Sequence, residues 1–151
     1  MTGLSHIATC HVQAPADVAF AYLSDPIKLG RWSLGCFDTG PSGEPGVYTG
    51  LSLFDGGRGW YRIDANAATR SIDFHVGAPP NLTHRISARV MAGAPLGYSK
   101  DACLVTLMAW RPANMDDDRW NRLCASHDAE IWLIKAQIET EYQAVSTNPS
   151  R

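Results

Sequence analysis

The sequence predicts an α+β domain in which an antiparallel sheet is followed by one long C-terminal helix. Three observations carry this prediction. Strand-like segments alternate in polarity through the middle of the chain, turn-forming residues separate them at short intervals, and the last third has an apolar period of about 3.6 residues. The 151 residues fit one domain by the prior of ~100–200 residues per domain.

The N-terminal part predicts a strand and two short helices. His6–Gln13 reads as the first strand, and Ala16–Leu23 reads as a helix that begins directly after a proline. Asp25 and Pro26 then open a second short helix, since an aspartate caps the free amides and a proline fixes φ at the first helical position. Gly30 is in the right place to end it.

The middle of the chain reads as an antiparallel meander. Its predicted strands are joined by short connections, which favour antiparallel neighbours. Asp55–Arg58, with two central glycines, predicts a tight hairpin turn between the first two strands. The strands are Val47–Phe54, Gly59–Ala67, Ser71–Val76, His84–Met91 and Ala102–Trp110.

The inward face of the second of these strands stays open between two arrangements. If Tyr61 faces the core, Arg62 and Asp64 form a solvated outer pair. If Trp60 faces the core instead, the two charged residues become a buried pair, which is costly unless it has a function. We favour the first arrangement. By the same alternation, Asp73 and His75 point outward.

The last element is predicted as a long helix over Asp116–Tyr142. Three aspartates at its start place negative charge at the positive end of the helix dipole, and Met115 and Trp120 occupy hydrophobic-staple positions. One apolar stripe follows the helical period, and we expect it to be buried against the sheet. The stripe comprises Trp120, Cys124, Ile131, Ile134, Ile138 and Tyr142.

Composition excludes several classes of function. A formal net charge of −2 does not attract nucleic acid or an anionic membrane by bulk charge. We expect a cytoplasmic protein, because we find neither a signal peptide nor a run of ~18 apolar residues. The four cysteines form no CxxC pair, so we expect reduced thiols. We find no metal-ligand spacing and no cofactor motif, and expect neither.

The local sequence resembles that of the START-like superfamily, also called SRPBCC or birch-pollen-allergen-like. The matching segments are Val12–Leu23, then Asp25 and Pro26, then Trp32, and finally Leu133–Glu139. The resemblance implies a helix-grip fold, in which a curved antiparallel sheet wraps a long C-terminal helix and leaves a cavity for an apolar ligand between them. It covers nearly the whole chain, so we expect one START-like domain over residues 1–145 and a disordered tail over residues 146–151.

Members of this superfamily include lipid carriers, polyketide cyclases, aromatases, hormone receptors and chaperone activators. They share no common catalytic residue, so the resemblance implies a pocket and leaves the reaction open. The oxygenase members carry iron ligands that this sequence does not match.

Two residues of the long helix are candidates for acid–base chemistry. His127 falls about 20° from the centre of the apolar stripe, where an imidazole would face the cavity and exchange protons near neutral pH. Glu130 lies one turn further on and could fix the tautomer of that imidazole. The alternatives are a core histidine satisfied by a neighbour and a half-exposed glutamate.

Five further residues are candidate ligand contacts. His84 alternates with Ile86, which places it on the apolar and presumed concave face of its strand, while Arg85 takes the outer face. Tyr61 joins it if its side chain faces inward. The long helix contributes the remaining three, which are Trp120, Cys124 and Ile131.

These features lead to one main hypothesis and two alternatives. The first is a protein that binds a small apolar or aromatic molecule in the cavity. The second is a cofactor-independent cyclase, aromatase, dehydratase or hydrolase that uses His127 as acid or base. Two or more polar groups converging on a deep pocket would favour this hypothesis. The third is a protein-interaction domain like the chaperone activators. A filled cavity and an exposed apolar patch around Trp132 would favour this hypothesis.

Overall fold

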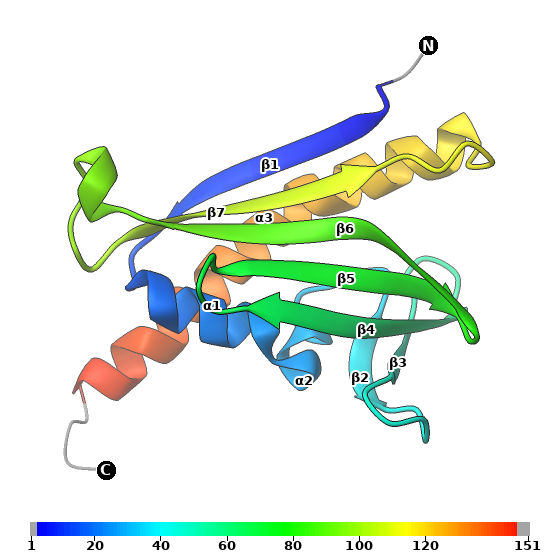
Figure 1. Ribbon diagram of the computed structural model, residues 1–151, viewed down its shortest axis with the longest axis horizontal. Helices are drawn as coiled ribbons and strands as arrows, with labels where there is room; N and C mark the ends of the chain where they lie inside the picture. Colours follow the sequence, from blue (N-terminus) through cyan, green and yellow to red (C-terminus); the bar gives the residue numbers. More distant parts are fainter. Residues whose placement is uncertain (1–2, 148–151) are drawn as a thin grey trace.

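Seven strands form one antiparallel sheet in the computed structural model, which describes residues 3–147 (Figure 1). Their order across the sheet is β1-β7-β6-β5-β4-β3-β2, so the first and last strands in sequence lie side by side. The strands are β1 (Ser5–Val12), β2 (Phe37–Pro41), β3 (Tyr48–Leu51), β4 (Arg58–Asn66), β5 (Ser71–Ala78), β6 (Asn81–Ala92) and β7 (Cys103–Trp110).

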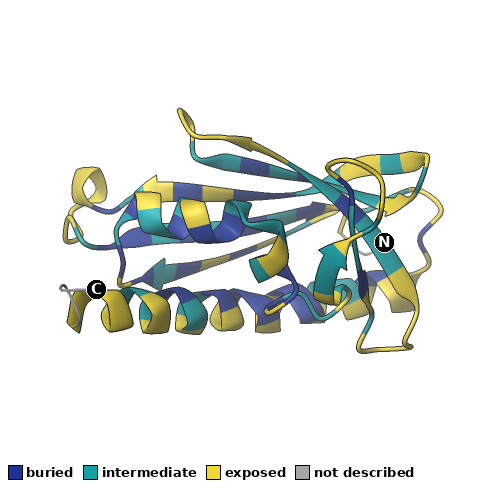
Figure 2. Cartoon of the chain, turned by 90° about the horizontal axis from the view of Figure 1, so that it is seen from below, coloured by how far each residue is buried: buried dark blue, intermediate teal, exposed yellow. Residues whose placement is uncertain are grey.

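The helices lie on one side of this curved sheet (Figure 2). The long helix α3 packs along β1 and β7, and α1 lies between α3 and strands β4 to β7. The helices are α1 (Ala16–Ser24), α2 (Pro26–Leu29), the 3₁₀ turn η1 (Ala94–Leu96) and α3 (Asp117–Thr147). This is a helix-grip arrangement of the α+β class, as the sequence predicted.

The two short helices form where their caps predict them. The Asp25 carboxylate accepts hydrogen bonds from the backbone amides of Ile27 at 2.9 Å and Lys28 at 3.3 Å. Gly30 ends α2 and lies against β2, where a Cβ atom would stand 2.3 Å from the amide nitrogen of Thr39. Only glycine permits that approach, which fixes the chain between α2 and the sheet.

The start of α3 also agrees with the sequence. The Asp116 carboxylate accepts a hydrogen bond of 2.8 Å from the amide of Arg119, and Met115 packs with Trp120 in a small apolar cluster. The helix is continuous to Thr147, five residues beyond the predicted end. Residues 146 and 147 are therefore helical, which corrects part of the predicted tail, while residues 148–151 lie outside the described residues.

The predicted stripe of α3 is buried except at its edges. Cys124 is only partly buried, which corrects our expectation, because it lies beside the small Met115 cluster and not over the main core. Tyr142 likewise packs on the core from its margin. The buried residues of α3 are Trp120, Ser126, His127, Glu130, Ile131, Ile134 and Ile138.

Two features of the meander differ from the prediction. β2 was not foreseen, because Phe37–Pro41 is short and contains a glycine and a proline. The strand predicted over Val47–Phe54 ends at Leu51, and a longer loop over residues 52–57 replaces the tight turn. That loop borders the candidate site.

Candidate functional site

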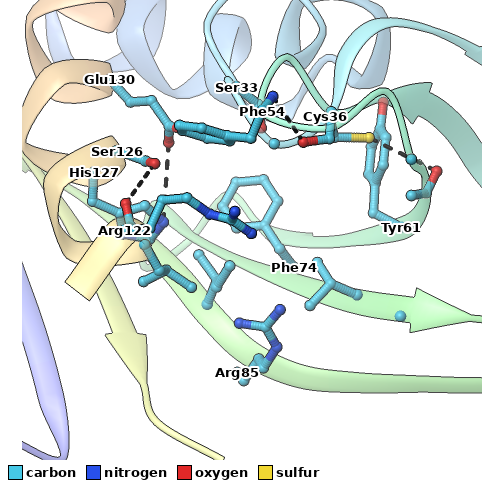
Figure 3. Close-up of a pocket in the computed structure, with 18 of the residues that line it drawn as sticks. Ser33, Cys36, Phe54, Tyr61, Phe74, Arg85, Arg122, Ser126, His127 and Glu130 are labelled. Atoms are coloured by element: carbon cyan, nitrogen blue, oxygen red, sulfur yellow. Dashed lines mark hydrogen bonds and ion pairs between the residues drawn. The ribbon is translucent and has the colours of Figure 1, made fainter. Parts of the chain in front are cut away.

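A cavity of about 390 Å³ lies between the sheet and the N-terminal half of α3 (Figure 3). At the other end of the molecule α1 fills the space between the helix and the sheet, so the cavity occupies the part that α1 does not reach. The loop after α2 and the loop over residues 52–57 complete its wall. Aromatic side chains supply much of the apolar surface, namely Trp32, Phe54, Trp60, Tyr61 and Phe74.

The carboxyl group of Glu130 lies on the α3 wall of the cavity and is nearly inaccessible to water. The residue is 3 % exposed, and its Oε1 accepts a hydrogen bond of 3.0 Å from the amide of Leu34. Burial raises the pKa of Glu130 to about 7, against the opposing effect of that hydrogen bond. Near neutral pH this group therefore exists both as acid and as carboxylate.

His127 lies one turn earlier on the same wall. Its Nε2 is 4.0 Å from Oε2 of Glu130, and its ring meets the ring of His6 edge-on at 6.1 Å between centroids. Burial lowers the pKa of His127 to about 4, with smaller contributions from the charges of His6 and Arg85. Glu130 therefore binds a proton more tightly than His127 does, and His127 is neutral whenever Glu130 is ionised near pH 7. The two side chains do not form an ion pair at that pH.

The imidazole keeps one polar atom uncommitted. Its Nδ1 is buried and has no hydrogen-bond partner within residues 3–147. Most buried polar atoms in proteins are paired, so this unpaired ring nitrogen is an exception. His127 and Glu130 together give the cavity two neighbouring groups that can donate or accept a proton.

Four arginines add positive charge to the same cavity. Arg85 enters from β6 and Arg122 from α3 (Figure 3). Arg119 also comes from α3, and Arg58 comes from the start of β4. The guanidinium of Arg122 lies over the ring of Phe54, 5.0 Å from the ring centroid. This cation–π contact joins α3 to the loop over residues 52–57. Asp55 also lines the mouth and is exposed, and its hydrogen bond from the amide of Gly57 lowers the pKa of its carboxyl group.

The position of Arg85 results from a β-bulge that the sequence analysis missed. Phe74 pairs with Ile86 and His75 pairs with His84, which leaves Arg85 as an extra residue in β6. The bulge interrupts the alternation of side chains. Arg85 therefore lines the cavity, although simple alternation assigned it to the outer face.

The same bulge moves His84 to the outer face of the sheet, so its predicted place on the concave face is wrong. Its Nε2 is 2.7 Å from Oγ of Ser87 and 3.3 Å from Oδ1 of Asp73. Its ring packs edge-on against Trp110 at 5.8 Å. His84 does not border the cavity.

Tyr61 lies on the cavity wall, as the favoured arrangement predicted. Its hydroxyl group donates to the carbonyl of Pro26, and its ring stacks on Tyr48 at 5.9 Å. Burial raises the pKa of Tyr61, so the phenol stays protonated. Arg62 and Asp64 lie on the outer face, where Asp64 is 2.8 Å from Nε2 of His75.

The other three candidates on α3 do not reach the cavity. Trp120 packs with Met115, Cys124 lies at the edge of that cluster, and Ile131 belongs to the main core. The cavity is lined by a neighbouring line of α3 residues that includes Leu123, Ser126 and Glu130, about a quarter turn around the helix from the stripe centre. His127 stands where the two lines meet.

Sequence reasoning therefore found three of the cavity residues, His127, Glu130 and Tyr61, and missed the arginines and Phe54. Among the described residues, no three His, Cys, Asp or Glu side chains gather in a way that could hold a metal ion. Within the same part of the chain, no helix is long and apolar enough to cross a membrane.

Comparison with known proteins adds evidence on the fold. No family model and no curated protein matches the sequence. Solved structures do match. The Zhui aromatase/cyclase from Streptomyces sp. R1128 has a TM-score of 0.65 at 16 % identity, over 97 % of this chain and 97 % of that one. A START superfamily protein from Mycobacterium smegmatis has a TM-score of 0.59 at 12 % identity, over 95 % and 99 %.

A third solved structure, the Aha1 dimer from Colwellia psychrerythraea, has a TM-score of 0.65 at 11 % identity and covers 91 % of this chain and 97 % of that one. These proteins have different names but share one architecture. At such low identities the matches show the fold alone.

Proposed function

We propose that this protein, which has the helix-grip fold of the START-like (SRPBCC) superfamily, binds a small, largely apolar or aromatic molecule in the cavity between its sheet and α3. The proposal rests on the size and lining of the cavity. Its volume of about 390 Å³ lies within the usual range of ligand pockets, and aromatic walls with a few converging polar groups are typical of such sites.

The open cavity favours this function over a protein-interaction domain. The interaction hypothesis required a filled cavity, and the space beside α3 is not filled. Trp132 is 61 % exposed on α3, but a single exposed tryptophan is common on a protein surface and does not by itself mark a partner site.

A fluorescent neutral arene tests the proposal directly. We expect N-phenylnaphthylamine to bind saturably with one site per chain, because its rings match the apolar walls. Ser126 is buried on the cavity face of α3, so Ser126→Phe should fill the space and abolish binding. Ala129→Phe, on an exposed position of the same helix, is the matched control and should bind normally. Binding that is not saturable, or that survives Ser126→Phe, would contradict the proposal.

A second candidate function is acid–base catalysis on the bound molecule, and one observation favours it. Glu130 combines burial on the cavity wall with a pKa near the working pH, which suits a general acid or base. His127, held neutral one turn away, can accept or relay the proton. Among the similar structures are the Zhui aromatase/cyclase and the di-domain ARO/CYC proteins BexL and StfQ, and cyclisation begins with removal of an acidic C–H proton.

Hydrogen exchange at an activated carbon tests this candidate without knowledge of the substrate. We expect the protein to accelerate deuterium incorporation from D₂O into a phenyl-substituted β-diketone, with a rate that rises as Glu130 ionises around pH 7. Glu130→Gln should lower this rate by ~10²–10⁴-fold while N-phenylnaphthylamine still binds. Glu44→Gln, at an exposed site, is the control. Equal rates with and without protein would exclude the catalytic role.

A further inference from the structure

Arg85 is a partly buried cation without a carboxylate partner among the described residues. Its side chain extends from β6 into the cavity, and its Nη1 is buried without a hydrogen-bond partner (Figure 3). Within residues 3–147 no carboxylate forms an ion pair with it. Removing part of a charged group from water without pairing it costs free energy, so the position of Arg85 calls for a partner.

The carboxyl groups that face the cavity do not supply that partner. Glu130 hydrogen-bonds to Leu34 on the opposite, helical wall and is largely protonated below pH 7. Asp55 lies at the exposed mouth of the cavity, where its carboxylate interacts electrostatically with Arg122 and Arg119. Arg119 repels Arg85 and lowers the pKa of its guanidinium, as burial does more strongly. Below pH 7 the interior of the cavity therefore has an excess of positive charge.

We infer that the bound molecule is an organic anion, most simply an aromatic carboxylate, whose acidic group pairs with Arg85 while its ring lies against the aromatic walls. This inference rests on the proposed ligand-binding function. A guanidinium presents two parallel N–H donors that match the two oxygens of a carboxylate, and such charge-assisted pairs are stronger than neutral hydrogen bonds.

The opposite walls of the cavity would then recognise different parts of the molecule. The sheet supplies the cation for the acidic group, and α3 supplies Glu130 and His127 for a neutral oxygen or an acidic carbon. Phe74, beside Arg85 on the sheet wall, offers the face for the ring between them. Arg119 and Arg122 at the mouth would attract an anion before it enters.

Two isosteric competitors separate charge from shape. Naphthoate and naphthamide have the same size and differ in charge, and each can be titrated against bound N-phenylnaphthylamine. We expect the wild-type protein to prefer naphthoate by ~10–100-fold at pH 6 and low salt, where naphthoate is ionised and Glu130 is largely protonated. Arg85→Met should remove this preference and still bind N-phenylnaphthylamine, whereas Arg85→Lys should keep part of it. Arg89→Met, on an exposed position of β6, is the matched control and should keep all of it.

The outcomes distinguish this inference from the proposed function. If N-phenylnaphthylamine binds but the wild-type protein takes both competitors equally, the cavity is a ligand site and the anion inference is wrong. If Arg85→Met keeps the preference, the arginine is not the anchor. If Arg85→Met does not fold, the wild-type preference and its partial retention in Arg85→Lys decide the question. Failure to bind any arene would instead refute the proposed function.

Discussion

Glu130 and His127 occupy one turn of α3, yet burial moves their protonation in opposite directions. Both lose their charged forms in the folded protein, so the acid gains a raised pKa, about 7, and the base a lowered one, about 4. Each shift links folding to pH. Glu130 contributes stability that is full below its unfolded pKa near 4.5 and is lost as the pH rises through 7. His127 contributes stability that is full above 6.5 and is lost as the pH falls through 4.

We therefore expect the two effects to cancel in the wild-type protein between pH 4.5 and 6.5, and single variants to separate them. Glu130→Gln should leave the His127 effect, so its free energy of unfolding rises with pH over this window. His127→Leu should leave the Glu130 effect, so its free energy of unfolding falls. Each change amounts to about 3 kcal/mol across the full range of the pKa shift. Urea unfolding at several pH values measures both.

Glu44→Gln provides the control for this experiment, because Glu44 is exposed and its removal should leave the pH profile unchanged. If both cavity variants follow the wild-type profile, the two groups are hydrated and titrate normally, and the acid–base candidate loses its basis.

Individual residues of the site could be predicted only where the local geometry is regular. His127 and Glu130 were found because α3 is an unbroken helix, so 100° per residue gives their direction correctly. His84 and Arg85 were each predicted on the wrong face of the sheet, because regular alternation was assumed through a β-bulge. No residue type in β6 indicates that bulge. A bulge depends on the partner strand, and a single strand's sequence does not contain that information.

At the scale of elements, the junction between α2 and β2 depends on a contact that the sequence signals only as a helix end. Gly30 was expected to close α2, and it does so while lying directly against Thr39. The Thr39 hydroxyl group donates to the carbonyl of Pro26, so Thr39 contacts both the first residue of α2 and the glycine that ends it. This junction carries the chain into the loop that borders the cavity.

We expect Gly30→Ala to lower the free energy of unfolding by about 1–3 kcal/mol, because its Cβ would stand 2.3 Å from a backbone nitrogen that has little room to move. Gly40→Ala is the matched comparison in β2, where an added Cβ meets nothing within 4 Å, and it should be neutral or slightly stabilising. Urea unfolding of the two variants tests the junction. Equal stabilities would mean that the contact with Thr39 relaxes freely.

Elements with strong internal signals were predicted more reliably than those defined by pairing. The capped helices and the long amphipathic helix follow from Asp25, Asp116 and the apolar stripe. β2 has no such signal, since its strand character comes from pairing with β3. The loop over residues 52–57 was predicted as a tight turn because two glycines dominate its sequence, although hydrogen bonds within the loop set its length.

For the molecule as a whole, the four thiols report on how tightly the sheet and α3 are held together. Cys10 and Cys103 lie buried between these layers, and the Cys10 thiol donates to the carbonyl of Ile131 at 3.6 Å. Burial raises the pKa of both thiols to about 11. Their reaction with an alkylating reagent therefore requires the layers to separate.

We expect mass spectrometry after iodoacetamide treatment at pH 8 to show Cys124 labelled first and Cys10 and Cys103 last. Cys36, which lines the cavity, should be protected when N-phenylnaphthylamine is bound. Denatured protein without reductant should give four labelled thiols, because all four cysteines are free in the structure. Fewer than four would mean that a disulfide forms in the isolated protein, and rapid labelling of Cys10 would mean that the layers open easily.

The order of the elements, together with the resemblance to the START-like superfamily, predicted the architecture apart from β2. A strand, two short helices, a meander and a long helix can be joined by short connections in few ways, which limits the possible folds once the elements are recognised. The chemistry of the cavity does not follow in the same way, because it depends on which side chains the curved sheet and the loops turn inward.

The bulge at Arg85 has a consequence for how this cavity can change during evolution. Because the strand on either side of it is paired in register, removing one residue there leaves the neighbouring pairs Phe74–Ile86 and His75–His84 possible. Deleting one codon would thus take the charge out of the cavity without disturbing the sheet, and inserting one would restore it. If Arg85 anchors an anion as inferred above, a lineage with this fold can move between neutral and anionic ligands by a single insertion or deletion, with no series of core substitutions in between.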